Sequence, residues 1–215
     1  MSRRNKKKRH VIGNVVRIIL LVVIFFGIYR FYIVKSQVEE VKLWKPVVIE
    51  EASRYGLEEF DDVILAIILT ETKGEHIDLM QSSESKYGEQ NQITSSEESI
   101  KSGVKHLAEV LTQSQNEGTD IWTGVQAYNF GSNYIPYVRD NGGRHNVKIA
   151  ERYSREVLAP LLGNNNNKKY RYLTLRALKY NKGHLYIDGG NFFYADIVKW
   201  NMAVLDVMSK IPWFS

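Results

Sequence analysis

The chain of 215 residues contains no cysteine and only four prolines. Without thiols it can form no disulfide, and a cysteine nucleophile or a cysteine-ligated metal site is excluded as well. The fold must therefore rest on packing alone, for which a content of 44% hydrophobic and 12% aromatic residues is sufficient. A chain of this length has room for one domain and an appendage.

Acidic residues are missing from the first 35 positions, where nine of the 29 Lys and Arg residues lie. The remainder has 20 basic against 24 acidic residues, so its net charge is about −4 although that of the whole chain is +5. The positive balance is therefore a signal of membrane topology, and it does not predict a nucleic-acid partner.

Residues 1–10 are a basic segment, and residues 11–34 are a mainly apolar run with two charges, Arg17 and Arg30. About 20 apolar residues suffice for a helix to cross a bilayer, and a basic flank stays in the cytoplasm. We therefore predict a cytoplasmic segment at 1–10, a single transmembrane anchor at 11–34 and an extracellular domain at 35–215, on the cell-wall side. A cleaved signal peptide is the alternative, although no small-residue cleavage site follows the run.

The exported part shows helical periodicity in several segments and no internal repeat. We expect helices at about residues 38–54, 61–70, 95–113, 120–130, 146–162 and 193–208, and a polar surface loop at 74–94. The segment YRYLTLRAL at 170–178 fits a strand or a helix equally well. These elements predict a mainly α domain around one core.

Glu71 stands at the end of an almost wholly apolar helix, after VILAIIL at 63–69. Burial raises the pKa of a carboxyl group and keeps its proton available for general acid catalysis near neutral pH. A carboxylate at this end also opposes the helix dipole, which is a cost that a function would explain. A solvated carboxylate with no function is the alternative interpretation.

Two later segments extend this signal, DLMQSSES at 78–85 and AYNFG at 127–131. The order of Glu, LMQ and AYNxG resembles the lytic transglycosylases and goose-type lysozymes of the lysozyme-like superfamily. The resemblance implies a lysozyme-like helical domain with Glu71 as the general acid and with peptidoglycan glycan strands as the substrate. The residues that it implies for sugar binding are Met80, Gln81, Ser82, Ser83, Glu84, Tyr128 and Asn129.

A closer resemblance is to the muramidase domains of Gram-positive conjugative elements and of the pneumococcal vaccine antigen A type, which share YSREVLAP at 153–160 and GGNFFY at 189–194. Two positions depart from the transglycosylase pattern, because Thr72 stands where Ser is usual and Asp78 replaces the Gly before LMQ. Many relatives carry a cysteine peptidase domain as well, and we expect this chain to hold only the glycan-cleaving half.

A second carboxylate close to the acid is what a glycoside hydrolase needs to activate water. We therefore predict hydrolysis of the β-1,4 bond between N-acetylmuramic acid and N-acetylglucosamine, in which Glu71 protonates the leaving oxygen and Asp78 orients or deprotonates water. A lytic transglycosylase, which forms 1,6-anhydro ends, is one alternative, and a non-catalytic peptidoglycan-binding scaffold is another. We expect no metal and no other cofactor, because the five histidines lack paired ligand spacing.

Overall fold

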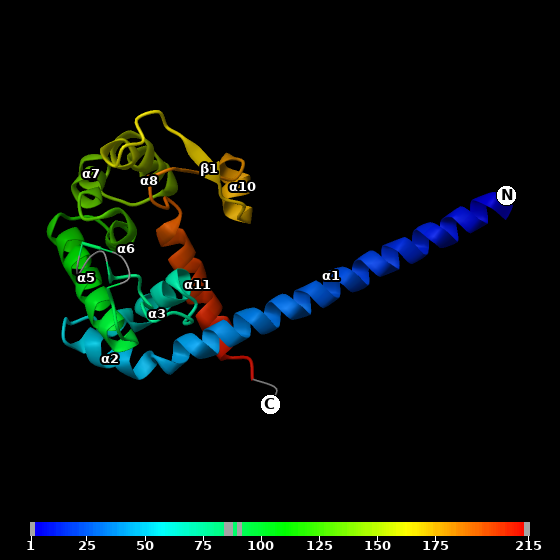
Figure 1. Ribbon diagram of the computed structural model, residues 1–215, viewed down its shortest axis with the longest axis horizontal. Coiled ribbons are helices and arrows are strands. Elements are labelled where there is room, and N and C mark those ends of the chain that lie inside the picture. The colour runs from blue at the N-terminus through cyan, green and yellow to red at the C-terminus, as the bar shows by residue number, and fades with distance from the viewer. Residues whose placement is uncertain (1–2, 84–87, 90–91, 213–215) are drawn as a thin grey trace.

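The structure is a computed structural model that describes residues 3–83, 88–89 and 92–212, with side chains from Ile12 onward. It is mainly α-helical, as the sequence predicts (Figure 1). The helices are α1 (Arg3–Leu43), α2 (Lys45–Ser53), α3 (Asp61–Glu71), α5 (Ser96–Asn116), α6 (Ile121–Phe130), α7 (Tyr134–Asp140), α8 (Val147–Tyr153), α9 (Ala159–Leu161), α10 (Leu175–Asn181) and α11 (Tyr194–Ser209). Single turns of 3-10 helix (Glu58–Phe60) and π helix (Ser154–Leu158) and the strands β1 (Lys169–Arg171) and β2 (His184–Tyr186) complete the described elements.

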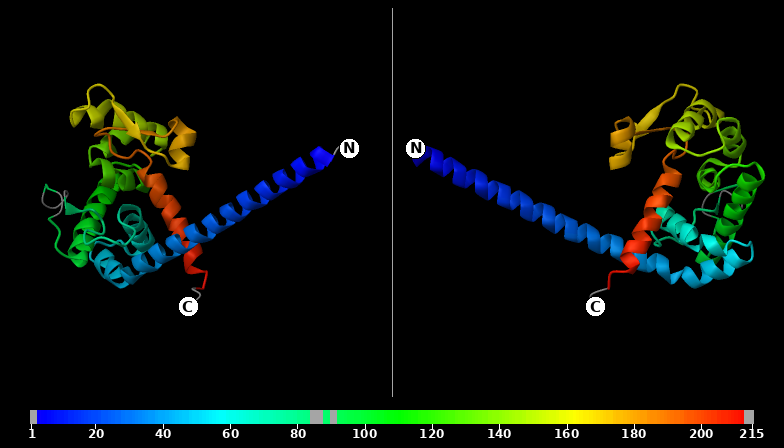
Figure 2. Two further views of the ribbon diagram at one scale, coloured as in Figure 1. Left: turned by 45° about the vertical axis from the view of Figure 1, so that its right-hand side comes forward. Right: turned by 180° about the vertical axis from the view of Figure 1, so that it is seen from behind.

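Helix α1 projects from the domain as one long rod (Figures 1 and 2). Its described residues from Ile12 onward form a helix that is long and apolar enough to cross a membrane. Residues 12–30 are exposed throughout, whereas Val38 and Val41 are fully buried in the domain. The buried ammonium of Lys35 donates to the carbonyl oxygen of Met208 over 2.8 Å. The apolar helix therefore enters the domain without a flexible linker.

The prediction of a separate helix at 38–54 is wrong in its first half, because residues 38–43 continue α1. The chain turns at Trp44, and α2 begins at Lys45 with a proline in its first turn. Proline has no amide hydrogen to donate, so it suits the start of a helix and cannot continue one. The break therefore falls just before Pro46.

The core is built around α3, whose residues 63–69 are all buried. Helix α3 packs against α11 and α2, and α5 packs against α6. Ser95 caps α5, since its hydroxyl accepts a hydrogen bond from the Glu98 amide. The short helix α7 was not predicted, and the segment 146–162 is divided into α8, the π turn and α9.

The undecided segment 170–178 contains both structures, the end of β1 and the start of α10. Strand β1 pairs antiparallel with β2, with Lys169 opposite Tyr186. The segment that joins α10 to α11 therefore begins with a short strand. Thr174 ends the extended part and starts α10, because its hydroxyl accepts a hydrogen bond from the Ala177 amide.

Candidate active site

Glu71 is the last residue of α3, where the buried apolar helix reaches a half-buried position. The next residue, Thr72, donates its hydroxyl to the carbonyl oxygen of Leu79 over 2.9 Å. Lys73 then takes a positive φ of 59°, which turns the chain back. The end of α3 is therefore joined directly to the start of the LMQ segment.

Tyr194 is the hydrogen-bonding partner of Glu71, with its hydroxyl 2.6 Å from Oε1. Tyr194 opens α11 and is only 2% exposed. Burial and the neighbouring charge of Glu71 raise the pKa of Tyr194 well above its ordinary value, so the hydroxyl keeps its proton and donates it.

The pKa of Glu71 is raised, mainly because burial disfavours its charged form. The hydrogen bond from Tyr194 lowers this pKa, the charge of Asp78 raises it, and the charge of Lys73 lowers it again. The effect of desolvation on the pKa of Glu71 outweighs the hydrogen bond from Tyr194 and the charge of Lys73, which both stabilise the carboxylate. Glu71 therefore holds its proton to a higher pH than a solvated carboxyl group does, which is the property that a general acid requires.

Tyr128, in α6, connects this acid to the LMQ segment. Its hydroxyl donates to the carbonyl oxygen of Met80 over 2.8 Å, and its ring stacks on that of Tyr194 with 6.3 Å between centroids and 13° between planes. The buried Tyr194 and the half-buried Tyr128 therefore fix Glu71 and the LMQ segment relative to each other.

Asn129 is exposed next to this pair, and its Oδ1 accepts a hydrogen bond of 2.9 Å from the Asn191 amide. The Gln126 amide group donates to the Asn191 carbonyl over 2.9 Å and accepts from the Ala195 amide over 3.1 Å. At Gly190, with φ +60°, a Cβ atom would lie 2.8 Å from the Phe130 ring. Glycine thus lets the GGNFFY segment lie against the end of α6.

A cavity of about 420 Å³ opens beside Glu71 and joins several of these groups. Its lining is Arg30, Val34, Gln37, Leu69, Thr70, Glu71, Lys73, Asn129, Tyr172, Asn191, Tyr194, Ile197, Trp200, Asn201 and Val204. Of the site residues predicted from the sequence, Glu71 and Asn129 line it. Arg30, Val34 and Gln37 come from α1, so the apolar helix forms one wall.

Asp78 lies outside this lining and is only 5% exposed. It accepts hydrogen bonds from the Ser99 hydroxyl over 2.6 Å and from the amides of Ser82 and Ser83 over 2.9 and 3.1 Å. Burial raises the pKa of Asp78, but these bonds outweigh it and the net shift is downward. Asp78 is therefore an ionised group that holds the turn after LMQ against α5.

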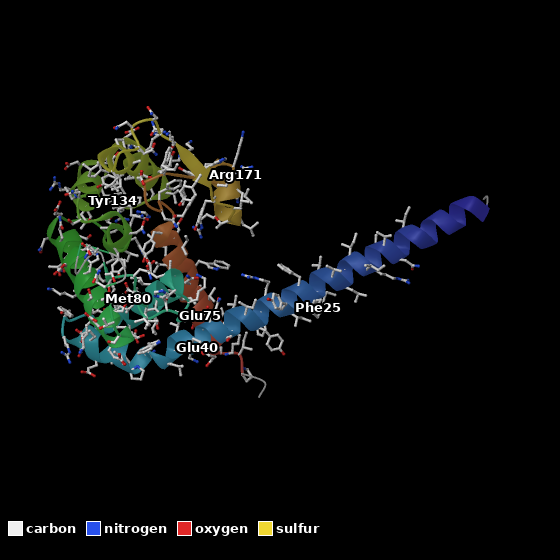
Figure 3. The ribbon with its side chains drawn as sticks, viewed as in Figure 1. Phe25, Glu40, Glu75, Met80, Tyr134 and Arg171 are labelled. Atoms are coloured by element: carbon white, nitrogen blue, oxygen red, sulfur yellow. The ribbon has the colours of Figure 1, made fainter. Side chains whose placement is uncertain are left out.

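The remaining predicted sugar-binding side chains are mostly buried. Met80 is 0% exposed and packs on Gly103, where a Cβ atom would lie 2.6 Å from its Sδ. Figure 3 shows Met80 among the helices of the domain. Ser82 and Ser83 are 1% and 3% exposed. Each of these three side chains therefore lies in the interior, and their role in sugar binding, which the resemblance implies, stays a prediction.

Gln81 is exposed and has a positive φ of 48°, and its amide donates to the Asp78 carbonyl over 3.1 Å. Its role in sugar binding stays a prediction. Glu84 lies outside the described residues. In the part of the chain that the structure describes, no three His, Asp or Glu side chains cluster as a metal site would require.

Tyr194 and Asn191 are site residues that the sequence did not identify, although the segment GGNFFY was singled out by its resemblance. Nothing in that segment shows which side chain meets the acid, because Tyr194 follows Glu71 by 123 positions.

A helical domain with a partly buried acid beside a cavity is the arrangement of a lysozyme-like protein. The chain matches the lysozyme-like family over residues 38–202 and belongs to it, which confirms the resemblance seen in the motifs. It is 40% identical over 189 residues to pneumococcal vaccine antigen A of Streptococcus pneumoniae, covering 88% of this chain and 92% of that protein.

It is also 32% identical over 195 residues to the bifunctional muramidase/DL-endopeptidase CwlT of Bacillus subtilis, covering 76% of this chain and 58% of that protein. A crystal structure of a Staphylococcus aureus protein, described as similar to a lipoprotein of the NLP/P60 family, matches with a TM-score of 0.69 at 35% identity. That match covers 76% of this chain and 52% of the other. The family and the muramidase relative support peptidoglycan hydrolysis in general.

Proposed function

We propose that the chain is an N-acetylmuramidase that cleaves the β-1,4 bond between N-acetylmuramic acid and N-acetylglucosamine, with Glu71 as the general acid. The observation that carries the proposal is the Tyr194–Glu71 hydrogen bond at the wall of the cavity. Oε1 accepts the hydrogen bond from the Tyr194 hydroxyl, so the acidic proton of Glu71 is the one on Oε2. A fixed carboxylic acid with a raised pKa is suited to protonate a glycosidic oxygen.

The other cavity groups suit a sugar chain. The amides of Asn129 and Asn191 can pair with N-acetyl groups, and Tyr172 supplies an aromatic surface. Tyr128 supports the acid from behind, through its bond to Met80 and its contact with Tyr194. We propose Gln81 as a further sugar contact from the exposed tip of the LMQ segment.

Asp78 fits a positioning role better than that of a base. Its lowered pKa makes it a weak acceptor for a proton from water, and its oxygen atoms already accept hydrogen bonds from three serines, Ser82, Ser83 and Ser99. We propose that its charge, which raises the pKa of Glu71, and its hold on the LMQ turn are its contributions. The prediction that Asp78 deprotonates water is tested by Asp78→Asn.

A lytic transglycosylase is the second candidate. Among the residues that the structure describes, Glu71 is the one carboxylate in the cavity lining, and a transglycosylase needs no second carboxylate because the muramic 6-hydroxyl attacks in place of water. Mass analysis of fragments released from sacculi separates the candidates. A muramidase gives reducing muramic ends, and a transglycosylase gives 1,6-anhydro ends that are lighter by one water.

We also propose that the domain lies outside the cell, on the wall side of a single-pass anchor. Six Lys and Arg residues precede the apolar helix at positions 3–9, which favours a cytoplasmic amino terminus. Protease added to intact, wall-stripped cells should remove the domain and leave the basic segment with the membrane. A domain that survives protease in intact cells but not in lysed cells would contradict this orientation.

A further inference from the structure

The segment from Lys168 to Lys182, which covers β1 and α10, differs in charge from the rest of the domain. It has six basic residues and no acidic one, although the chain beyond residue 35 is net negative. The six are Lys168, Lys169, Arg171, Arg176, Lys179 and Lys182, and all are exposed. Within the described residues, only Arg176 among them pairs with a carboxylate, that of Asp196 at 2.6 Å.

Three leucines of the same segment face solvent. Leu173 is 67% exposed, Leu175 is 87% exposed and Leu178 is 46% exposed. Leu175 is the first residue of α10, so it projects from the start of the helix. Exposed leucines among basic side chains, five of which have no carboxylate partner in the described residues, combine apolar area with positive charge. This is the composition of surfaces that bind at a membrane interface.

The segment also lies close to the place where the apolar helix α1 enters the domain. Leu175 and Arg176 line a second cavity, of about 630 Å³, together with Arg30 of α1 and Trp200 of α11. Figures 1 and 2 show α10 on the side of the domain from which α1 projects, and Figure 3 shows Arg171 at the same edge, on the side of Phe25.

Arg30 follows directly after residues 12–29, which are exposed and mainly apolar. At 1.5 Å per residue this stretch is about 27 Å long, close to the roughly 30 Å of a hydrocarbon core. A bilayer around residues 12–29 therefore has its surface near Arg30, at the height of α10. The predicted anchor extends five residues farther, to residue 34, and Arg30 and Val34 of this part line the cavity beside Glu71.

We propose that residues 168–182 form a docking surface for the anionic phospholipids of the bilayer that α1 crosses. The leucines enter the interface and the unpaired Lys and Arg side chains bind headgroup phosphates. The rigid junction of α1 with the domain holds this surface against the membrane. Arg30 also lines the cavity beside Glu71, so docking keeps the candidate active site next to the membrane surface.

The test uses the full chain in vesicles, and its lack of cysteine makes single-cysteine labelling specific. Leu175→Cys carries an environment-sensitive fluorophore, and the vesicles contain phosphatidylcholine with or without phosphatidylglycerol and nitroxide-labelled lipid. We expect a blue shift and at least a threefold increase in quenching by the labelled lipid when phosphatidylglycerol is present. Ile121→Cys is the control, an exposed position at the start of α6, and should show neither change.

The charge requirement is tested by replacing Lys168, Lys179 and Lys182 with Gln in the Leu175→Cys chain. Lipid quenching should fall to the level seen in phosphatidylcholine alone. The matched control replaces three exposed lysines of α5 and α8, Lys101, Lys105 and Lys148, and should leave the quenching unchanged. High salt should weaken the contact in the same way, because it screens exposed charges.

A label at Leu175 that stays in water on anionic vesicles would overturn the proposal. The proposal would also be overturned if the label became shielded from water only as the protein density in the vesicles rises, without quenching by the labelled lipid. A second copy of the chain would then cover the segment. Glu71→Gln should dock as the unmodified chain does. Failure of docking and failure of glycan cleavage are therefore separate results.

Discussion

The hydroxyl of Tyr194 lies 2.6 Å from Oε1 of Glu71, although 123 positions separate the two residues. One stands at the end of α3 and the other at the start of α11, and these two helices pack against each other in the core. The buried tyrosine cannot ionise near neutral pH, so it acts as a permanent donor to one oxygen of the acid. This contact orients the proton that the proposed reaction requires.

Tyr194→Phe should shift the alkaline limb of the pH–activity profile to higher pH and lower the maximal rate at least tenfold. The hydrogen bond stabilises the charged form of Glu71, so its loss raises the pKa of the acid further. The rate falls because the acid loses its orientation. Tyr134→Phe is the matched control, since it removes the hydroxyl of another buried tyrosine, bonded to His145. An unshifted limb in Tyr194→Phe would limit Tyr194 to a packing role.

Glu71→Gln should stabilise the folded chain at neutral pH and have little effect in acid. Because the folded-state pKa of Glu71 is raised, the natural chain loses stability as pH rises from the ordinary carboxyl pKa through the raised one. The glutamine side chain of the variant does not ionise, so the variant loses no stability in this way. Thermal unfolding measured across this window should show a difference that grows with pH, at about 2–4 °C for each kcal/mol in a domain of this size. A difference that is constant with pH would contradict the raised pKa.

Glu71 could be singled out from the sequence because its signal is local. The apolar run at 63–69 predicts burial, and Glu71 stands two positions after its last residue. The same locality limits what the sequence can show of Met80, Ser82 and Ser83, since the residue types of the LMQSS segment do not show which way the side chains point. Only the tertiary structure shows that Asp78 holds the turn and draws these side chains inward.

Three kinds of element could not be assigned from the sequence: a very short helix, breaks inside long helical segments, and strands that form only as a pair. Helix α7 is only seven residues long, too short for a periodic signal. The break at Trp44 and the division of 146–162 by a π turn concern backbone geometry within strongly helical segments. Strands β1 and β2 form as a pair, so neither could be assigned from its own residues.

Asp78→Asn should destabilise the fold by about 2 kcal/mol near neutral pH, because a buried, hydrogen-bonded carboxylate is replaced by a neutral group. The pKa of Asp78 is lowered in the folded chain, so its contribution is present above the ordinary carboxyl pKa and is lost as pH falls through the lowered one. The difference in unfolding free energy should shrink in acid. Asp206→Asn, at an exposed carboxylate paired with Lys210, should cost much less.

The activity of Asp78→Asn decides between its two roles. A positioning role predicts a downward shift of the alkaline limb, since the charge of Asp78 raises the pKa of Glu71. A base that deprotonates water predicts loss of cleavage by orders of magnitude in a chain that is still folded at neutral pH.

Tyr128→Ala should lower the rate of glycan cleavage at least tenfold, which is about 1.4 kcal/mol of lost transition-state stabilisation, with the helical circular dichroism spectrum retained. The variant loses the bond to Met80 and the ring beside Tyr194. Tyr128→Phe keeps the ring and should lose only about 1 kcal/mol of stability. Equal activity in all three chains would show that Tyr128 serves the helix end alone.

The most direct test of the proposed function is mass analysis of the glycan fragments that the full chain and its Glu71→Gln variant release from sacculi. Glutamine keeps the shape of the acid and can accept the Tyr194 hydrogen bond, but it has no proton to donate. We expect fragments with reducing muramic ends from the natural chain, and from the variant a yield lower by orders of magnitude with sacculus binding retained. Undiminished release by Glu71→Gln would contradict the assignment of Glu71 as the general acid.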